Sequence, residues 1–158
     1  MKLIINNILS IAAAVLIAAG CSKPATEEVP VLDNALVGEW HLTQTEVDGS
    51  VLYTQHDIYI AFHKDCTFEL FQKSGDQQRF TKLTGTCSLE GNRLTGIYSD
   101  GTPWGSAYTI VLAADSLTLT NETLTEVQTY TKEAINEGIR NNADIKVKSS
   151  GNDIIPIL

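Results

Sequence analysis

The sequence predicts an all-β protein, an eight-stranded antiparallel up-and-down barrel with a short C-terminal helix. From Leu36 onward, apolar residues alternate with polar ones over short runs, as in strands with one buried face. Turn-forming residues break these runs at short intervals, which is typical of an antiparallel meander. The 158 residues suit one domain with a single core. An open two-sheet sandwich is the alternative all-β arrangement.

The predicted strands follow one another closely along the chain. Ile58, Ile60 and Phe62 share one face of the second run. Glu90-Gly91-Asn92-Arg93 predicts a tight hairpin turn, because Gly and Asn tolerate a positive φ. Closing the strands into a barrel leaves no unpaired edge. The runs cover residues 37–46, 57–63, 67–72, 79–89, 94–98, 108–112, 117–119 and 126–131.

The pattern changes after Thr131. Ala134, Ile135 and Ile139 have helical spacing, which predicts a short helix over 132–140 packed outside the barrel. Residues 141–153 are polar, and the apolar end 154–158 either docks on the body or is frayed. The predicted organisation is a leader (1–20), a tether (21–35), a barrel domain (36–132), and a helix with a tail (133–158).

The first twenty residues have the form of a signal peptide. The apolar run 8–19 is about twelve residues long, whereas a membrane-spanning helix needs roughly twenty. Ala18-Ala19-Gly20-Cys21 resembles a bacterial lipobox, which implies that Cys21 is acylated and becomes the first mature residue. Such acylation anchors a protein effectively permanently. Because Ser22 is not Asp, the resemblance implies the outer membrane, and an ordinary secretory leader is the alternative.

Charge and motifs exclude several function classes. A net charge of −8 disfavours nucleic acid as a partner. His41, His56 and His63 lack the short spacings of a zinc site. Neither a nucleophile elbow nor a Gly-rich phosphate loop is present in the sequence. We therefore expect a protein that is not an enzyme and has neither a cofactor nor a metal site.

Cys66 and Cys87 remain as thiols after acylation, in an oxidising compartment. If the third and fourth strands turn around residues 76 and 77, the two cysteines lie opposite each other. Their Cα atoms would then be roughly 4.5 to 5.5 Å apart, within disulfide range. This placement predicts a structural disulfide. The alternative is two unrelated small apolar residues.

Five motifs, taken in order, resemble those of lipocalins and of lipocalin-like lipoproteins of Bacteroidetes. Gly38-Glu39-Trp40 resembles the Gly-x-Trp opening of lipocalins. The resemblance implies that Trp40 packs across the closed end of the barrel, often against a basic residue from the last strand, where Lys132 and Arg140 are the nearest candidates. The other motifs are Lys64-Asp65-Cys66-Thr67-Phe68, Leu89-Glu90-Gly91-Asn92-Arg93-Leu94, Tyr98-Ser99-Asp100-Gly101 and Leu117-Thr118-Leu119-Thr120.

The resemblance implies a lipid-anchored envelope protein that binds a small hydrophobic ligand. An eight-stranded barrel holds either side chains or one small ligand. The inward residues expected to line a cavity are Phe62, Phe68, Leu70, Leu94, Tyr108 and Leu119. The alternative is a non-enzymatic accessory protein with a solid barrel. It would contact a protein or glycan through rim residues Tyr53, Tyr98, Trp104 and Tyr108.

Ser116 is a candidate site of O-glycosylation. Asp115-Ser116-Leu117 resembles the acceptor sequence of Bacteroidetes, in which Asp precedes Ser or Thr and an apolar residue follows. The alternative is that Asp115 and Ser116 serve only the turn between two strands, which the Asx-turn preference explains.

Overall fold

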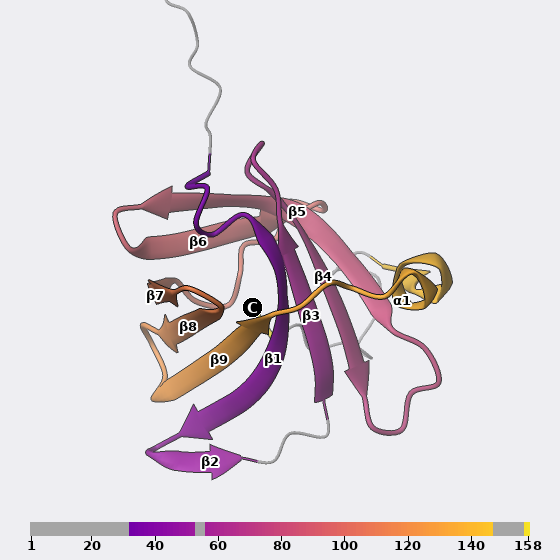
Figure 1. Cartoon of the computed structure of the whole chain (residues 1–158), viewed down its shortest axis with the longest axis horizontal. Coiled ribbons are helices and arrows are strands. Elements are labelled where there is room, and N and C mark those ends of the chain that lie inside the picture. The colour runs from indigo at the N-terminus through magenta and orange to yellow at the C-terminus, as the bar shows by residue number, and fades with distance from the viewer. Residues whose placement is uncertain (1–31, 53–55, 147–156) are drawn as a thin grey trace, which may run out of the picture.

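The computed structural model describes residues 32–52, 56–146 and 157–158. Within these residues the chain forms ten strands and one short helix (Figure 1). The elements are β1 (Gly38–Val47), β2 (Ser50–Leu52), β3 (His56–Phe62), β4 (Thr67–Ser74), β5 (Thr81–Glu90), β6 (Arg93–Tyr98), β7 (Tyr108–Ala113), β8 (Ser116–Asn121), β9 (Glu126–Lys132), α1 (Glu137–Asn142) and β10 (Asp144–Ile145).

Strand pairing confirms the predicted closed barrel. The strands from β3 to β9 pair antiparallel in chain order, and β3 also pairs with β1. Pairing of β1 with β9 then closes the ring of eight strands (Figure 1). Since the ring is continuous, the alternative of an open sandwich is wrong.

The ladder between β6 and β7 is short. Two residue pairs join these strands, Arg93 with Thr109 and Leu94 with Tyr108. Trp104, from the loop between them, packs edge-on against Phe68 with ring centroids 5.1 Å apart. Its indole also covers Gly96, where an added Cβ would lie 2.2 Å from the ring. The Trp104 side chain thus fills space beside the short ladder.

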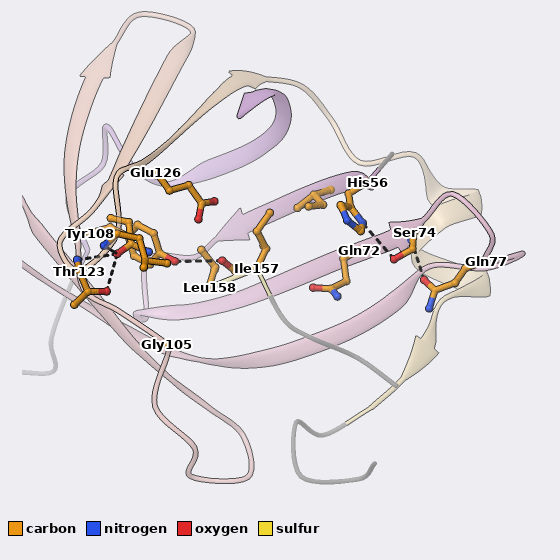
Figure 2. A pocket seen from close by; sticks show the side chains of 13 residues that line it. His56, Gln72, Ser74, Gln77, Gly105, Tyr108, Thr123, Glu126, Ile157 and Leu158 are labelled. Carbon is orange, nitrogen blue, oxygen red and sulfur yellow. Dashed lines mark hydrogen bonds between the residues drawn. The ribbon is translucent and has the colours of Figure 1, made fainter. Parts of the chain in front are cut away.

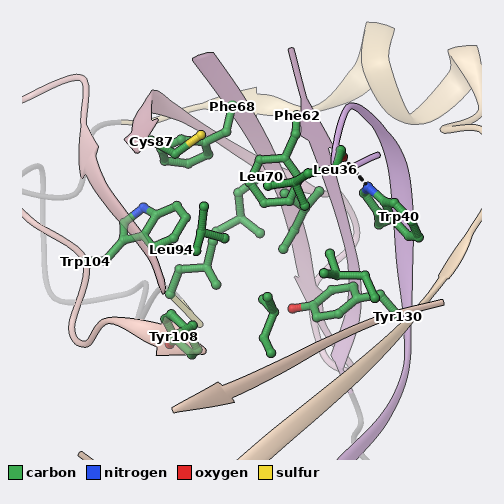
Figure 3. Close-up of a cluster of buried hydrophobic side chains, with 14 of the residues drawn as sticks. Leu36, Trp40, Phe62, Phe68, Leu70, Cys87, Leu94, Trp104, Tyr108 and Tyr130 are labelled. Atoms are coloured by element: carbon green, nitrogen blue, oxygen red, sulfur yellow. Dashed lines mark hydrogen bonds between the residues drawn. The ribbon is translucent and has the colours of Figure 1, made fainter. Parts of the chain in front are cut away.

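Alternation along the strands directs one apolar face into the barrel. In the pairing of β3 with β4, Ile60 lies opposite Leu70 and Phe62 lies opposite Phe68. All four side chains are at most 1% exposed and belong to one buried cluster (Figure 3). Each fully buried side chain of this size contributes roughly 1.5 to 3 kcal/mol through removal of apolar surface from water.

A smaller cluster lies on the outer face, beneath the segment that leads into α1. Ile135 packs with Tyr59, Phe71 and Phe80. Arg140 of α1 is held by two carboxylates, with Nη1 2.8 Å from Glu69 and Nη2 2.5 Å from Glu39. These contacts hold α1 against the outside of the barrel (Figure 1). No helix among the described residues has the length and apolarity to cross a membrane.

Local hydrogen bonds place the helix later than the predicted span of 132–140. The backbone N–H groups of Lys132 and Glu133 donate to carbonyls of Asp115 and Glu39, which keeps both residues with the sheet. The Asn136 side chain then accepts from the Gly138 N–H at 2.7 Å and caps the helix. The sequence pattern also missed β2 and β10, because two or three exposed residues show no alternation.

Candidate functional site

The two ends of the barrel differ, and we name them by their residues. The closed end carries Leu36 and Trp40, which are 0% and 1% exposed. Trp40 Nε1 donates to the Leu36 carbonyl at 3.0 Å (Figure 3), and the Lys132 ammonium lies 5.5 Å from the indole centroid. Lys132, the last residue of β9, is therefore the basic residue beside Trp40. Arg140 lies instead on the outer face, with Glu39 and Glu69.

The middle of the barrel is packed. Phe62, Phe68, Leu70, Leu94 and Leu119, all expected to line a cavity, are at most 1% exposed within the main cluster. Phe68 contacts Tyr98 and Trp104 edge-on, with centroids 5.7 and 5.1 Å apart. Tyr108 is the one of the six predicted residues that lines the open-end cavity described below, and Phe68 lines a second cavity of the same volume, about 560 Å³, between β4, β5 and β6.

A cavity of about 560 Å³ lies at the open end, which we define by the loops 75–80, 99–107 and 122–125. Figure 2 shows Tyr108 and Thr123 on one side of it and His56, Gln72 and Ser74 on the other. Its walls mix apolar and polar groups. The lining residues are His56, Ile58, Gln72, Ser74, Gln77, Gly105, Tyr108, Asn121, Thr123, Leu124, Glu126, Ile157 and Leu158.

A line of polar side chains runs along β9 from the core to this cavity. The Tyr130 hydroxyl, fully buried, donates to Gln128 Oε1 at 2.6 Å, and Gln128 Nε2 donates to Glu126 Oε1 at 2.7 Å. Thr45 pairs with Gln128 across the β1–β9 ladder. Its buried hydroxyl has no hydrogen-bond partner within the described part of the chain. Glu126, Gln128 and Tyr130 alternate along the sequence, which is the signal that could have identified this inward polar row.

Ile157 and Leu158, which we call the tail residues, line part of the cavity. Leu158 is 2% exposed and belongs to the main core cluster. The Tyr98 hydroxyl donates to a main-chain oxygen of Leu158 at 2.8 Å, and the Tyr108 hydroxyl donates to the Ile157 carbonyl at 3.2 Å. Figure 2 shows both tail residues between the two walls. Of the predicted segment 154–158, these two residues dock on the body, and the other three lie outside the described residues.

The phenols that hold the tail residues stay protonated at neutral pH. Burial, with a smaller contribution from the Glu126 charge, raises the pKa of Tyr108 to about 12. Burial also raises the pKa of Tyr98 above its ordinary value. Because each phenol keeps its proton, each remains a hydrogen-bond donor to the tail residues.

The predicted rim is not an exposed aromatic surface. Tyr98, Trp104 and Tyr108 are 2%, 6% and 2% exposed, and all three belong to the main core cluster. The prediction that they contact a partner on the rim is therefore wrong, since the loop 99–107 turns Trp104 inward over Gly96. Tyr53, the fourth member of that set, lies outside the described residues.

The two internal cysteines lie where the predicted register puts them, but both are free thiols. Thr67 pairs with Thr86, and the Cys87 N–H donates to the Cys66 carbonyl at 2.7 Å. Cys66 has φ 61° in the turn before β4, so its side chain leaves the regular strand direction that the disulfide prediction assumed. Cys87 is buried, and this burial raises its pKa to about 12.

His41 lies on the outside of the barrel between two carboxylates. Nε2 is 3.1 Å from Asp57 and Nδ1 is 2.9 Å from Glu133, while the ring stacks on Tyr59 with centroids 4.1 Å apart. Among the described residues, no group of three or more His, Cys, Asp or Glu residues is placed to hold a metal. These contacts join β1, β3 and the segment after β9.

The remaining predicted sites are not tested by the structure. Ser116 is half-buried at the start of β8 and pairs with Ala113 and Thr131. Cys21 and the rest of residues 1–31 lie outside the described residues. Acylation of Cys21 and glycosylation of Ser116 stay predictions.

Comparisons with known proteins establish the class of this protein. A lipocalin-like domain matches residues 36–125, more than half of the chain, so the chain belongs to the lipocalin-like domain family. A lipocalin-like protein from Bacteroides uniformis shares the fold, with a TM-score of 0.52, 23% identity, and coverage of 63% of this chain and 99% of that one.

Two further solved structures are more distant. An uncharacterized protein from Bacteroides eggerthii has a TM-score of 0.48 and 14% identity, covering 62% of this chain and 99% of that one. A lipoprotein, YedD, from Klebsiella pneumoniae has a TM-score of 0.46 and 9% identity, covering 70% of this chain and 83% of that one. No curated protein matches this chain.

Proposed function

We propose that the protein is a lipid-anchored cell-envelope binding protein whose open-end cavity takes one small, mostly apolar ligand. The cavity of about 560 Å³ carries this proposal, because small-molecule sites typically measure roughly 300 to 1,000 Å³. Ile58, Leu124 and the Tyr108 ring supply apolar surface, while Gln72 and Glu126 supply polar groups. Such a mixture favours an apolar ligand with a few polar atoms.

Family membership also supports binding over catalysis. Lipocalin-like folds are typically those of non-enzymatic binding proteins.

Filling the cavity tests the proposal directly. Gly105 lines the cavity, and a Cβ added there meets no atom within 4 Å. Gly105→Trp should therefore add an indole at the wall of the cavity without a clash with the fold, and Gly105→Ala is the matched control. Two fluorescent probes would be titrated, an undecanoic acid that carries a dansyl group and laurdan, a neutral ketone with a lauroyl chain.

We expect wild type and Gly105→Ala to bind at least one probe, and Gly105→Trp to bind it about tenfold more weakly, or about 1.4 kcal/mol. Thermal unfolding would show that all three variants are folded. If wild type binds neither probe, or if Gly105→Trp binds as tightly as Gly105→Ala, the cavity is not the binding site.

The lipid anchor rests on the sequence around Cys21. We expect the wild-type chain expressed in a bacterium to partition into detergent and to incorporate labelled palmitate, whereas Cys21→Ser does neither. Cys66→Ser is the matched control, because it removes a thiol far from the leader and should leave both properties unchanged. Equal partitioning of wild type and Cys21→Ser without palmitate label would reject the anchor.

A further inference from the structure

The tail residues line the open-end cavity and lie between its two walls, where a ligand would contact them. The Leu158 side chain is buried in the main core cluster, and the Ile157 carbonyl accepts a hydrogen bond from Tyr108, which lines the cavity. Figure 2 shows Ile157 and Leu158 lying between the wall that contains Tyr108 and the wall that contains Gln72. Apolar side chains and carbonyl oxygens are thus both accommodated at this position.

We propose that Ile157 and Leu158 compete with the ligand for the open end of the barrel, and that the Tyr108 hydroxyl, which lines the cavity, is the ligand's polar recognition point. This inference rests on the proposed binding function and adds the ligand class. The ligand carries an apolar body and an oxygen that accepts the hydrogen bond that Tyr108 now donates to the neutral Ile157 carbonyl.

The charge around the cavity favours a neutral carbonyl over a carboxylate. Glu126 lines the same cavity as Tyr108 and forms a hydrogen bond with Gln128. A second negative charge beside Glu126 would be repelled at this partly enclosed position. We therefore expect laurdan to bind more tightly than the dansyl fatty acid.

Displacing the tail residues tests the competition. Leu158→Asp would put a charge into an apolar position, so the tail should leave the cavity. Ile145→Asp is the matched control, because Ile145 is 81% exposed on β10 and does not line the cavity. Leu158→Ser gives a second, uncharged variant. If the tail occupies the cavity about nine-tenths of the time, either Leu158 variant should bind laurdan about tenfold more tightly than wild type.

Methyl NMR of labelled Ile and Leu residues provides a separate readout in wild type. Adding laurdan should shift the Ile157 and Leu158 methyl signals toward those of exposed residues, while the buried Ile60 signal stays unchanged. A ligand that enters beside the tail would leave the Ile157 and Leu158 signals in their buried environment.

The outcomes separate this inference from the proposed function. Tighter laurdan binding by both Leu158 variants, with Ile145→Asp unchanged, supports both. If wild type and the Leu158 variants bind laurdan equally, the competition is wrong but the binding function stands. Preference for the fatty acid would overturn the neutral-carbonyl assignment. If neither wild type nor the Leu158 variants bind either probe, the binding function and the competition both fail.

Discussion

The closed and open ends of the barrel are built from the same strands but differ in what they enclose. At the closed end, Trp40 and Leu36 are almost fully buried, and the one indole N–H is satisfied by the Leu36 carbonyl. At the open end, a cavity of about 560 Å³ has polar as well as apolar walls, to which the tail residues belong. One end is sealed by packing and the other is left available for a ligand.

The difference teaches that stability and binding are divided along the barrel axis. Dense packing of large apolar side chains in the middle and at the closed end supplies most of the burial. The open end can then hold polar groups such as Glu126 and Gln72, which contribute less to stability but give a ligand directional contacts. Substitutions at the two ends should therefore have different consequences.

The largest effect is expected at the closed end. Trp40→Ala removes a side chain that is 1% exposed and should lower the free energy of unfolding by about 3 to 5 kcal/mol. Urea denaturation measures this loss, and Val111→Ala, at a position 61% exposed on β7, is the control. Laurdan affinity of the folded protein should stay unchanged. A loss below about 1 kcal/mol would show that Trp40 does not seal this end.

A smaller loss is expected where a buried side chain faces the cavity. Ile58 is 2% exposed but lines the open-end cavity, so Ile58→Ala removes fewer packing contacts and should cost about 2 kcal/mol. Phe68→Ala, in the packed middle, should cost about 3 to 5 kcal/mol without weakening laurdan binding. Calorimetry and probe titration measure both quantities. Equal losses at the two positions would erase the distinction between packed middle and open end.

Breaking the row of hydrogen-bonded polar side chains along β9 should lower the free energy of unfolding by a smaller amount. Tyr130→Phe removes the hydroxyl that donates to Gln128 and leaves the Gln128 amide oxygen without that donor, at a cost of about 1 to 2 kcal/mol. Gln128 also positions Glu126, so laurdan affinity should change as well. Thr129→Val, at a half-buried position on the same strand, is the control for strand propensity. If Tyr130→Phe changes neither stability nor laurdan affinity, this row of hydrogen bonds contributes to neither.

The smallest effect is expected on the outer face of the closed half. Partial burial alone would raise the pKa of Glu69, but hydrogen bonds from Lys82 and Arg140 outweigh it and hold the pKa below its ordinary 4.5. Because the folded pKa is lowered, the resulting stability is complete above pH 4.5 and is lost as the pH falls through the folded pKa.

Glu69→Gln should therefore lower the free energy of unfolding at pH 7 by less than about 1 kcal/mol. In this variant the free energy of unfolding should also fall less than in wild type as the pH is lowered. Urea denaturation at a series of pH values measures this, and Glu90→Gln at a β5 position remote from Arg140 is the control. If Glu69→Gln and wild type lose stability in parallel on acidification, these ion pairs are not the source of the acid sensitivity.

The sequence by itself determined the barrel and the faces of its strands. Alternation through Ile58, Ile60 and Phe62 is a local property of an extended chain, because successive side chains point to opposite faces. The turn signals then set the strand order, and the mirror positions of Cys66 and Cys87 predicted the register between β4 and β5. Each of these inferences depends on neighbouring residues or on a single hairpin.

Only the tertiary structure decided where space remains and what occupies it. No local pattern shows that Trp104 turns inward over Gly96, or that His41 meets Asp57 and Glu133. The tail residues reach Tyr98 and Tyr108 from 60 and 49 positions away. The physical reason is that alternation assigns a side chain to the interior, whereas filling that interior depends on side chains from all eight strands and from distant segments at once.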